Sequence, residues 1–347
     1  MTVGDHNWAL GLRINGRELA PEYRKTVQSV KVLQDLESAG SVTLAVSAPR
    51  DEVLAWFDKA RVDEGSPIEV EMGTAEHVDL VFAGDITGLE ISFGGRLAVS
   101  LSLRGYDRRH RLMRSYNPGS HTKVKDSKLV ADIARKHGLE VKATATSIEH
   151  PYLLQAKQND HKFLRERAEA NGFELFIVGK TLYFRPCAHK DPPALRLSAE
   201  TDLLEFHASV TSMNQASEVR VGGWDVANKR AIVGTATSAT LGRGSGPSRS
   251  KSLFGPSLRA DGEFPVASQA EAEARANAQL LELALGHLTA DATLHGNSAI
   301  HPGMVVAIDD VGARFSGNYY VTSASHDFEL AGSGRYETRL TMRRAAS

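Results

Sequence analysis

Apolar and polar residues alternate over a long stretch between Leu80 and Leu103, and this pattern restricts the fold more than any other feature of the chain. The apolar or small positions are Leu80, Phe82, Gly84 and Ile86 and then, after a shift of one residue, Leu89, Ile91 and Phe93. Such a shift moves side chains to the other face of a strand unless an extra residue is absorbed. Because Gly88 lies at the shift, we predict a β-bulge there.

The rest of the first hundred residues also indicates β-structure. Gly94-Gly95 precedes a second alternating run, which is typical of a hairpin. Shorter alternating runs cover 8–14, 27–33, 41–46 and 68–72. A single short helix is predicted after Pro49, with acidic residues in its first turn. Many short strands separated by turns favour a barrel or a sandwich.

The periodicity becomes helical in the middle of the chain. A helix is predicted from Ser127 to His137, because its apolar residues recur on one helical face. A second helix should begin after Asp160 and end at Gly172. Two strands around Gly179-Lys180 then complete a helix–helix–hairpin unit, which predicts a small α+β domain.

The last third of the chain returns to strands after one unusual segment. Residues 235–256 are rich in Gly, Ser, Thr and Pro, and we predict a mobile loop there. The following helix, 267–288, should present a stripe to the core and direct Glu271, Glu273 and Arg275 to water; the stripe is Ala270, Ala274, Ala278, Leu281 and Leu285. Strands are predicted at 304–308, 319–328 and 336–342; Tyr336, Thr338, Leu340 and Met342 share one face of the last.

Charge and cysteine content exclude several classes of protein. The 347 residues carry a net charge of −1, which gives no general attraction to nucleic acid or to an anionic membrane. Cys187 is the only cysteine, so the chain has neither an intrachain disulfide nor a cysteine-rich zinc site. No apolar run is long enough to cross a membrane, and the N-terminus lacks the pattern of a signal peptide. We therefore expect synthesis in the cytoplasm.

No catalytic signature that we tested occurs in the sequence. The hydrolase elbow G-x-S-x-G, the phosphate loop and the zinc motif H-E-x-x-H are all missing. The nearest approach to a phosphate loop, Gly242 to Gly246, is followed by Pro247 where lysine is needed, and it is interpreted as a flexible linker. Cys187 is interpreted as a structural thiol, because no base can be assigned to it. We accordingly predict no catalytic, cofactor-binding or metal-binding residues.

Histidines and acidic pairs give weak signals for the same reason. Of the 13 histidines, only His295 and His301 lie within a few residues of each other downstream of a helix. Neither has acidic or cysteine partners at ligand spacing, so packing and surface roles are favoured over metal binding. The others named as candidates are scattered: His110, His121, His137, His150, His161, His189, His207, His287 and His326. Asp309-Asp310 is interpreted as a pair of surface acids at a turn rather than as hydrolase carboxylates.

The segment from Arg104 to Arg114 is the one concentrated basic run, and it includes Tyr106. Basic side chains neutralise phosphates and an aromatic ring can stack on a base, so the run is compatible with nucleic-acid binding. A solvated junction between the first β unit and the α+β unit is favoured instead, because the chain as a whole is neutral. A subunit interface is the third interpretation.

Two segments resemble a known family. The first is Gln158-Asn159-Asp160-His161-Lys162-Phe163-Leu164, followed by Ala168 and Gly172; the second is Ile300-His301-Pro302-Gly303, followed by Phe315-Ser316-Gly317-Asn318-Tyr319-Tyr320-Val321 and His326. They resemble the Q-x-D-x-x-F-L…A…G segment and the closing P-G…F-S-G-x-Y-x-V…H segment of the phage late control protein D family, which is related to the N-terminal hub part of VgrG spike proteins. With the β, α+β, β order, the resemblance covers most of the chain.

This resemblance implies a mostly β, α+β fold with two tube-type antiparallel β-barrel domains. The implied division is a first barrel over 1–106, an α+β domain over 107–190, a second barrel over 191–225 and 295–347, and an inserted loop and helix region over 226–294. It also implies a structural baseplate hub of a contractile tail or tail-like injection system. Such hubs are trimers whose six barrels form a pseudo-sixfold ring between a tail tube and a trimeric spike. The partners would be two further copies, the spike, the tube protein and other baseplate proteins. The chain would be synthesised in the bacterial cytoplasm and assembled into a phage tail or tail-like particle, in the virion baseplate.

Expectations about the chain ends and the contact surfaces follow from the same resemblance. VgrG chains continue into a β-prism spike, whereas this sequence stops at Ser347, so we expect the spike on a separate chain. Strand edges within 80–105 and 304–342 are predicted to make the tube-to-tube contacts. The alternatives are a tail-associated cell-wall hydrolase, which the missing motifs disfavour, and a nucleic-acid-binding protein acting through 104–114. We expect no cofactor and no membrane binding by the chain itself.

Overall fold

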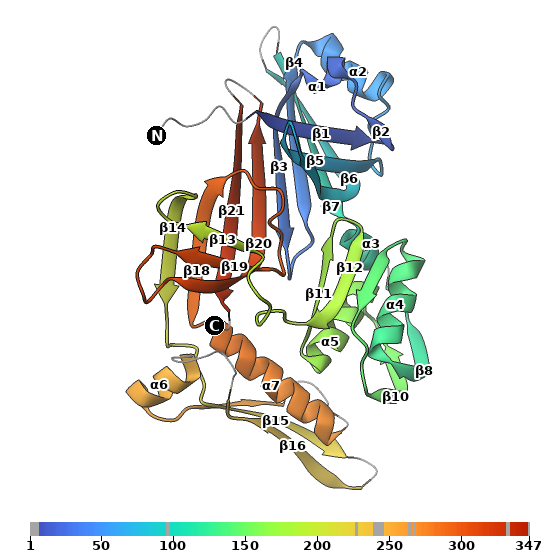
Figure 1. Cartoon of the computed structure of the whole chain (residues 1–347). Coiled ribbons are helices and arrows are strands. Elements are labelled where there is room, and N and C mark those ends of the chain that lie inside the picture. The colour runs from blue at the N-terminus through green and yellow to red at the C-terminus, as the bar shows by residue number, and fades with distance from the viewer. Residues whose placement is uncertain are drawn as a thin grey trace.

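One curled sheet of thirteen strands organises the chain, as the computed structural model shows (Figure 1). The structure describes residues 7–94, 98–114, 116–225, 228–238, 246–262, 266, 268–330 and 334–345. Within the sheet the strands run β14-β18-β21-β20-β3-β4-β7-β6-β5-β1-β2, and β13 and β19 extend it from β20. The mostly β character predicted from the sequence is confirmed.

The first half of the large sheet is formed by residues before 108. Its strands and helices are β1 (Trp8–Ile14), β2 (Arg17–Glu18), α1 (Pro21–Arg24), β3 (Val27–Asp35), β4 (Ser41–Ala48), α2 (Arg50–Asp58), β5 (Pro67–Thr74), β6 (Val78–Gly94) and β7 (Ala98–Asp107). Its apolar side chains form one cluster around the fully buried Trp56 of α2. The helix predicted after Pro49 is therefore present, and it covers this cluster.

The long β6 strand confirms the predicted bulge and adds a second one. Ile86 pairs with Gly105 and Gly88 with Arg104, so Thr87 is the extra residue beside the predicted glycine. A further register shift against β5 leaves Val81 unpaired, and Val81 and Phe82 are consequently both buried. Leu80, which we assigned to the same face as Phe82, is 37% exposed. The second bulge has no glycine beside it to signal its position.

The second half of the large sheet is formed by β13 (Leu195–Ser198), β14 (Leu203–Val210), β18 (Leu288–His295), β19 (Val305–Asp309), β20 (Gly317–Glu329) and β21 (Arg335–Arg344). It has its own apolar cluster, centred on buried residues of β19, β20 and β21. The predicted face of the last strand is confirmed, since Tyr336, Thr338, Leu340 and Met342 are at most 2% exposed. The two halves are joined by antiparallel pairing of β3 with β20, in which Ser29 lies opposite Glu329 and Asp35 opposite Ser323.

The α+β unit lies between the two halves in sequence and beside the sheet in space (Figure 1). It contains α3 (Arg109–Met113), β8 (Gly119–Lys125), α4 (Asp126–Lys136), β9 (Glu140–Ala143), β10 (Glu149–Gln155), α5 (Asp160–Asn171), β11 (Phe173–Val178) and β12 (Thr181–Pro186). The predicted apolar face of α4 is buried. Asn159 caps α5 by accepting a hydrogen bond from the backbone N–H of Lys162, and Gly172 ends the helix in the left-handed conformation.

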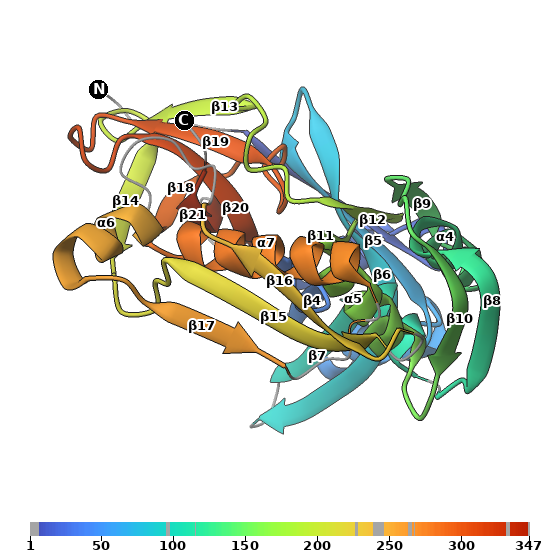
Figure 2. The same cartoon turned by 90° about the horizontal axis from the view of Figure 1, so that it is seen from below.

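The remaining elements form a layer of their own, which lies below the large sheet in Figure 1 and in front of it in Figure 2. They are β15 (Glu218–Asp225), β16 (Arg230–Ala236), α6 (Gly246–Phe254), β17 (Leu258–Asp261) and α7 (Gln269–Leu285). β15 pairs with β16 and β17 in a three-stranded sheet, and α7 packs on it. β18, which the resemblance placed in the inserted region, pairs with β14 and β21 in the large sheet.

Two predictions for this region are wrong. Part of the expected mobile loop is strand and helix: β16 reaches Ala236, and α6 buries Gly246, Pro247 and Ser250. Residues 239–245 of that segment, with most of the Gly242–Gly246 run, lie outside the described residues.

No helix within the described ranges is long and apolar enough to cross a lipid bilayer.

The second error concerns α7, whose predicted stripe is in the wrong phase. Ala272, Ala276 and Leu280 face the small sheet and are fully buried, and Glu271 and Arg275 are buried as well. Of the predicted stripe, Leu285 is buried as expected and Ala270 is exposed. Ala278 is turned toward α5, where a Cβ at Gly172 would be 2.9 Å from the alanine Cβ. Glu273 is exposed, as predicted. The helix is covered on two sides, so a single apolar stripe could not describe it.

Candidate functional site

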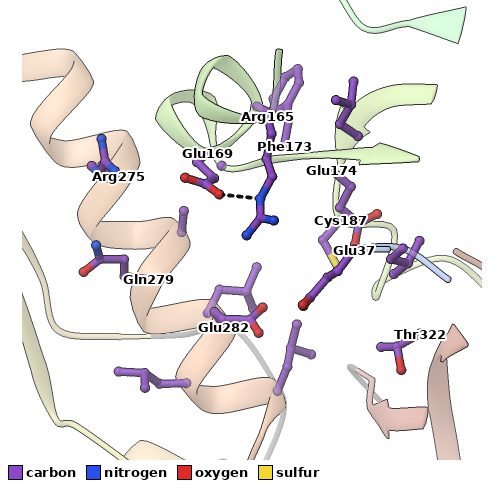
Figure 3. A pocket seen from close by; sticks show the side chains of 18 of the residues that line it. Glu37, Arg165, Glu169, Phe173, Glu174, Cys187, Arg275, Gln279, Glu282 and Thr322 are labelled. Atoms are coloured by element: carbon purple, nitrogen blue, oxygen red, sulfur yellow. Dashed lines mark hydrogen bonds and ion pairs between the residues drawn. The ribbon is translucent and has the colours of Figure 1, made fainter. Parts of the chain in front are cut away.

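A pocket of about 810 Å³ lies where the large sheet, the α+β unit and α7 meet (Figure 3). Its wall includes the turn after β3, the end of α5, β11, one side of α7 and residues of β20 and β21. Both acidic and basic side chains line it. Arg165 Nε donates to Glu169 Oε1 at 3.0 Å, the contact marked in Figure 3. Arg343 lies between Glu37, at 3.2 Å, and Glu282.

Burial has the largest effect on the pKa values of three titratable groups at one end of this pocket, and it raises all three. Burial raises the pKa of Glu174, and its carboxylate accepts a hydrogen bond from the hydroxyl of Tyr320. Burial, followed by the negative charge of Glu174, also raises the pKa of the Cys187 thiol and that of Tyr320. A nucleophilic cysteine needs a lowered pKa instead. Cys187 therefore has the environment of a packed thiol, as the sequence interpretation held.

The basic run 104–114 lies at the junction between the first half of the sheet and the α+β unit. Arg109 is 1% exposed, and its guanidinium donates to the carbonyls of Asp35, Leu36 and Ser38 in the turn after β3. Arg111 Nε and Nη2 bind the two carboxylate oxygens of Asp85 at 2.7 and 2.6 Å. These arginines are thus engaged inside the chain. The junction interpretation is confirmed in position, but four of the eleven residues are buried rather than solvated: Gly105, Asp107, Arg109 and Leu112.

Asp85 shows how firmly this junction is held. Burial alone would raise its pKa, but hydrogen bonds from Arg111 and from His110, at 2.8 Å, together hold the pKa of that carboxyl below its ordinary value. The carboxylate is therefore ionised at neutral pH and links β6 to α3. On the adjacent strand β7, by contrast, Arg104 makes an exposed ion pair with Glu90 of β6, at 2.9 Å.

The other candidate residues are placed apart from one another. His137 binds Asp160 at 2.7 Å and His150 binds Asp126 at 3.0 Å, each in its own part of the α+β unit. No group of three or more His, Cys, Asp or Glu side chains within the described ranges is arranged to hold a metal ion. The predicted acidic turn is present: Asp309 pairs with Arg196 at 2.6 Å, and Asp310 adopts a positive φ of 64°.

The second segment that resembles the hub family contacts the hairpin that directly follows the first segment. Gly303, at a φ of 87°, packs so closely on this hairpin that an added Cβ would be 2.7 Å from the ring of Phe176. Arg185 stacks on Phe176 at 5.2 Å and donates to the carbonyl of Gly303. Gly317 is the second turn glycine with a positive φ, 136°. Gly303 therefore holds the hairpin of the α+β unit against the second half of the sheet.

The large sheet repeats one strand order in its two halves. In the first half the hydrogen-bonded order is β1-β5-β6-β7-β4-β3, and in the second it is β13-β19-β20-β21-β18-β14. The strands that correspond in these two orders also follow one another in the same sequence along the chain. One difference is that β1 is antiparallel to β5, whereas β13 is parallel to β19. The α+β unit separates the repeats, and the smaller sheet with α6 and α7 interrupts the second.

Besides the outer strands β2 and β13, two edges of this repeated sheet are left without a strand partner among the described residues. One is the outer edge of β14, which pairs only with β18. The other is the distal half of β6, residues 88–94, which pairs only with β7 because the pairing with β5 ends at Asp85. Unpaired strand edges are ready templates for another strand. The alternation of Phe206, Ala208 and Val210 is the sequence signal from which the first of these edges could have been found.

Proteins of known structure share this fold over nearly the whole chain. The 43 kDa tail protein of prophage MuSo2 from Shewanella oneidensis is 12% identical, with a TM-score of 0.73 and coverage of 97% of this chain and 98% of that one. A tail protein from Neisseria meningitidis MC58 is 15% identical, with a TM-score of 0.70 and 97% coverage of both chains. The E. coli c3393 protein is 12% identical, with a TM-score of 0.59 and coverage of 97% of this chain and 77% of that one. It is a component of the type VI secretion system and is described as structurally similar to the phage T4 tail proteins gp27 and gp5.

The fold is therefore that of phage tail proteins and VgrG-related components, which confirms the resemblance to baseplate hubs found in the sequence. Residues 6–329 match the family described as the Alg8 N-terminal domain, and the chain belongs to that family. No curated protein matches the chain.

Proposed function

We propose that this chain is the structural baseplate hub of a contractile tail or tail-like injection system. Three copies form a ring in which six similar sheet halves alternate around a central axis. The ring joins the tail tube on one side to a trimeric spike on the other. The repeated strand order β1-β5-β6-β7-β4-β3 and β13-β19-β20-β21-β18-β14 is the observation that supports this proposal most directly.

The repeat supports the proposal because a chain with two equivalent halves presents six equivalent units in a trimer. Such a ring can match a sixfold tube, while the parts outside the repeat occur only three times. The neighbours in fold agree with this assignment of class, since they are tail proteins, a type VI secretion component and VgrG in complex with Francisella PdpA. The partners that follow are two further copies of the chain, a tube protein, a spike protein and other baseplate proteins. The site of action is the assembled particle.

The chemistry of the pocket favours assembly over catalysis. Its arginines and carboxylates pair with one another, as Arg343 does with Glu37 and Glu282. Its thiol, Cys187, is kept protonated by burial and by a neighbouring carboxylate. Both features suit a packed junction between units. A peptidoglycan turnover assay with the purified chain checks this directly, and robust release of soluble fragments contradicts the structural role.

Particle analysis tests the proposal itself. Tail-like particles are purified from cells that express this chain with its neighbouring tail genes, and the copy number of the 37.6 kDa chain is measured by quantitative mass spectrometry. We expect three copies per particle, located by antibody labelling at the end of the tube that carries the spike. A chain absent from particles, or present in many copies along the tube, contradicts the proposal. Particles from a strain lacking the gene serve as the control.

A further inference from the structure

The contact between the two halves of one chain provides a template for the contact between two chains. Within the chain, β20 has a proximal part paired with β19 and a distal part, 323–329, paired with β3. In the repeat, β6 corresponds to β20 and β14 corresponds to β3. The proximal part of β6 pairs with β5, as expected from this correspondence, but its distal part has no second partner among the described residues, and neither does the edge of β14.

Bulges at equivalent positions fix the correspondence residue by residue. The extra residue in β6 is Thr87 and that in β20 is Thr322, so Gly88 corresponds to Ser323. The cross-strand partners of these two positions can be followed from strand to strand across each half of the sheet. The two paths end at Lys31 of β3 and at His207 of β14, so these two residues correspond.

The same alignment places Leu204 on Gln28. These two residues are the bulges of β14 and β3, respectively. The bulges of β3 and β14 were not used to make the alignment, and they check it independently. A shift of one residue in either direction would separate them.

Inward side chains are buried at the β20–β3 contact but not at the corresponding positions of β6 and β14. This is the difference expected if β6 and β14 lack a partner strand. At the β20–β3 contact, the inward side chains are buried: Ala324, His326 and Phe328 on β20, and Val30, Val32 and Gln34 on β3. The corresponding residues of β6 and β14 are Leu89, Ile91, Phe93, Phe206, Ala208 and Val210. None of these is buried; Ile91 is 37% and Phe93 is 58% exposed. Six apolar side chains thus stand at positions that are covered in the other contact.

We propose that β14 of one chain pairs antiparallel with residues 88–94 of β6 in the next chain, with His207 opposite Ser92 and Phe206 opposite Phe93. This register is the β20–β3 register transferred by the repeat. It places apolar residues opposite apolar ones on the inward side, as with Leu89 and Val210. On the other side it places Glu90 opposite Ser209. Such directly opposed pairs are the stabilising unit of an antiparallel contact.

The proposed pairing makes the large sheet continuous from chain to chain. Each chain supplies the run β14-β18-β21-β20-β3-β4-β7-β6, whose two ends are the two unpaired edges. Joining them leaves no edge of this run exposed, which removes the tendency of open edges to aggregate. The inference rests on the proposed function for the number of chains in the ring, but the strand pair and its register follow from the repeat alone.

Cysteine pairs measure the register. We replace Ser92 and His207 together, S92C with H207C, and compare this variant with S92C combined with E205C or S209C. All four side chains are exposed. After mild oxidation of the concentrated protein, we expect S92C with H207C to form disulfides between chains. Their yield should be at least about tenfold above the yield from either shifted pair, because Cα atoms more than about 7 Å apart cannot be bridged without backbone movement. The wild-type chain, whose thiol at Cys187 is protonated by burial, is the control without added cysteines.

A second variant tests the same contact without cysteines. F93E adds a charge to the apolar side of the contact, and F254E makes the same change on α6, where Phe254 is 75% exposed. Because both positions are exposed, both variants should retain the circular dichroism spectrum of the wild type. We expect F93E to weaken self-association by at least about tenfold in sedimentation equilibrium, since the contact would have to remove a carboxylate from water. F254E should leave association unchanged.

Each outcome decides one question. No product from any cysteine pair, equal yields from all three, or F93E associating as tightly as F254E overturns the proposed strand pair. If three copies of the chain are found in particles and S92C with H207C still does not link, the function stands and the interface is wrong. If the in-register disulfide forms but the chain is absent from particles, the interface stands and the proposed function is wrong.

Discussion

His326 provides the sharpest test of how the large sheet is held together. The imidazole is fully buried between the halves of the sheet. Nε2–H donates to the carbonyl of Ile300 at 3.1 Å, and Nδ1 accepts from the hydroxyl of Tyr336 at 2.8 Å. Burial lowers the pKa of His326 to about 4; the Ile300 carbonyl and Asp327 oppose this effect and His301 adds to it. The folded state therefore requires a neutral ring.

The sign and size of the pH dependence follow from this requirement. The folded pKa lies below the ordinary value of 6.5, so the stabilisation is complete above that value and is lost as the pH falls toward 4. At pH 5 the unfolded imidazole is almost entirely protonated, while the folded one is almost entirely neutral. One pKa unit corresponds to about 1.4 kcal/mol, so acidification from pH 7 to pH 5 should remove about 2 kcal/mol of unfolding free energy through this residue.

H326Q tests the magnitude, because glutamine can donate to the same carbonyl but does not titrate in this range. Urea unfolding at pH 7 and pH 5 gives the free-energy difference for each protein. H326Q should be less stable at pH 7 but should lose about 2 kcal/mol less than the wild type on acidification. H77Q, at an exposed histidine 3.0 Å from Asp79, is the control and should keep the wild-type pH dependence. Identical pH dependence in H326Q and the wild type would refute the reasoning.

Two further substitutions test tight packing and the buried junction. G296A places a methyl group 1.9 Å from a ring atom of Tyr336, so thermal unfolding should show a loss of about 1–3 kcal/mol in unfolding free energy. G262A, which has open space around it, is the control and should show no such loss. Equal effects of the two substitutions would contradict the packing argument. R109A removes the donor to three partly buried carbonyls and the cation beside the buried Asp107, whose carboxylate then keeps only hydrogen bonds from backbone N–H groups. Urea unfolding should show a loss of about 3–5 kcal/mol, against at most about 1 kcal/mol for the exposed R104A. A small loss in R109A would show that the junction does not depend on this arginine.

Sequence reasoning succeeded where a local signal marks the structure. Gly88 marks the bulge in β6 and Gly172 marks the end of α5, and both are confirmed. The start of α5 was predicted after Asp160, and the helix begins at Asp160 itself, with Asn159 as its cap. Sequence reasoning failed where the signal is not local. The second bulge of β6 depends on the register of β5, and the phase of α7 depends on which of two neighbours covers each side of the helix.

The candidate site shows the same division. The run 104–114 could be recognised as a junction, but the burial of Arg109 depends on carbonyls of the turn after β3, some seventy residues away in sequence. The two strand edges were predicted only in part: 80–105 contains one of them, whereas the edge of β20 in 304–342 is already paired with β3. The edge of β14 was not predicted, although the alternation of Phe206, Ala208 and Val210 marks this strand in the sequence.

Parts outside the repeat explain how one chain could serve neighbours of different symmetry. The α+β unit follows the first half of the sheet, and the smaller sheet with α7 interrupts the second half, so the two halves of a chain differ everywhere except in the shared strands. These two additions are not independent, because Gly172 at the end of α5 packs directly against Ala278 of α7. In the proposed ring they would form three bodies beside six sheet halves. Contacts made by the strands would then repeat six times and contacts made by the additions three times. Substitutions on the exposed surface of the additions should therefore impair attachment of a threefold partner while leaving tube attachment intact, and a variant there that lost the tube alone would contradict this division of roles.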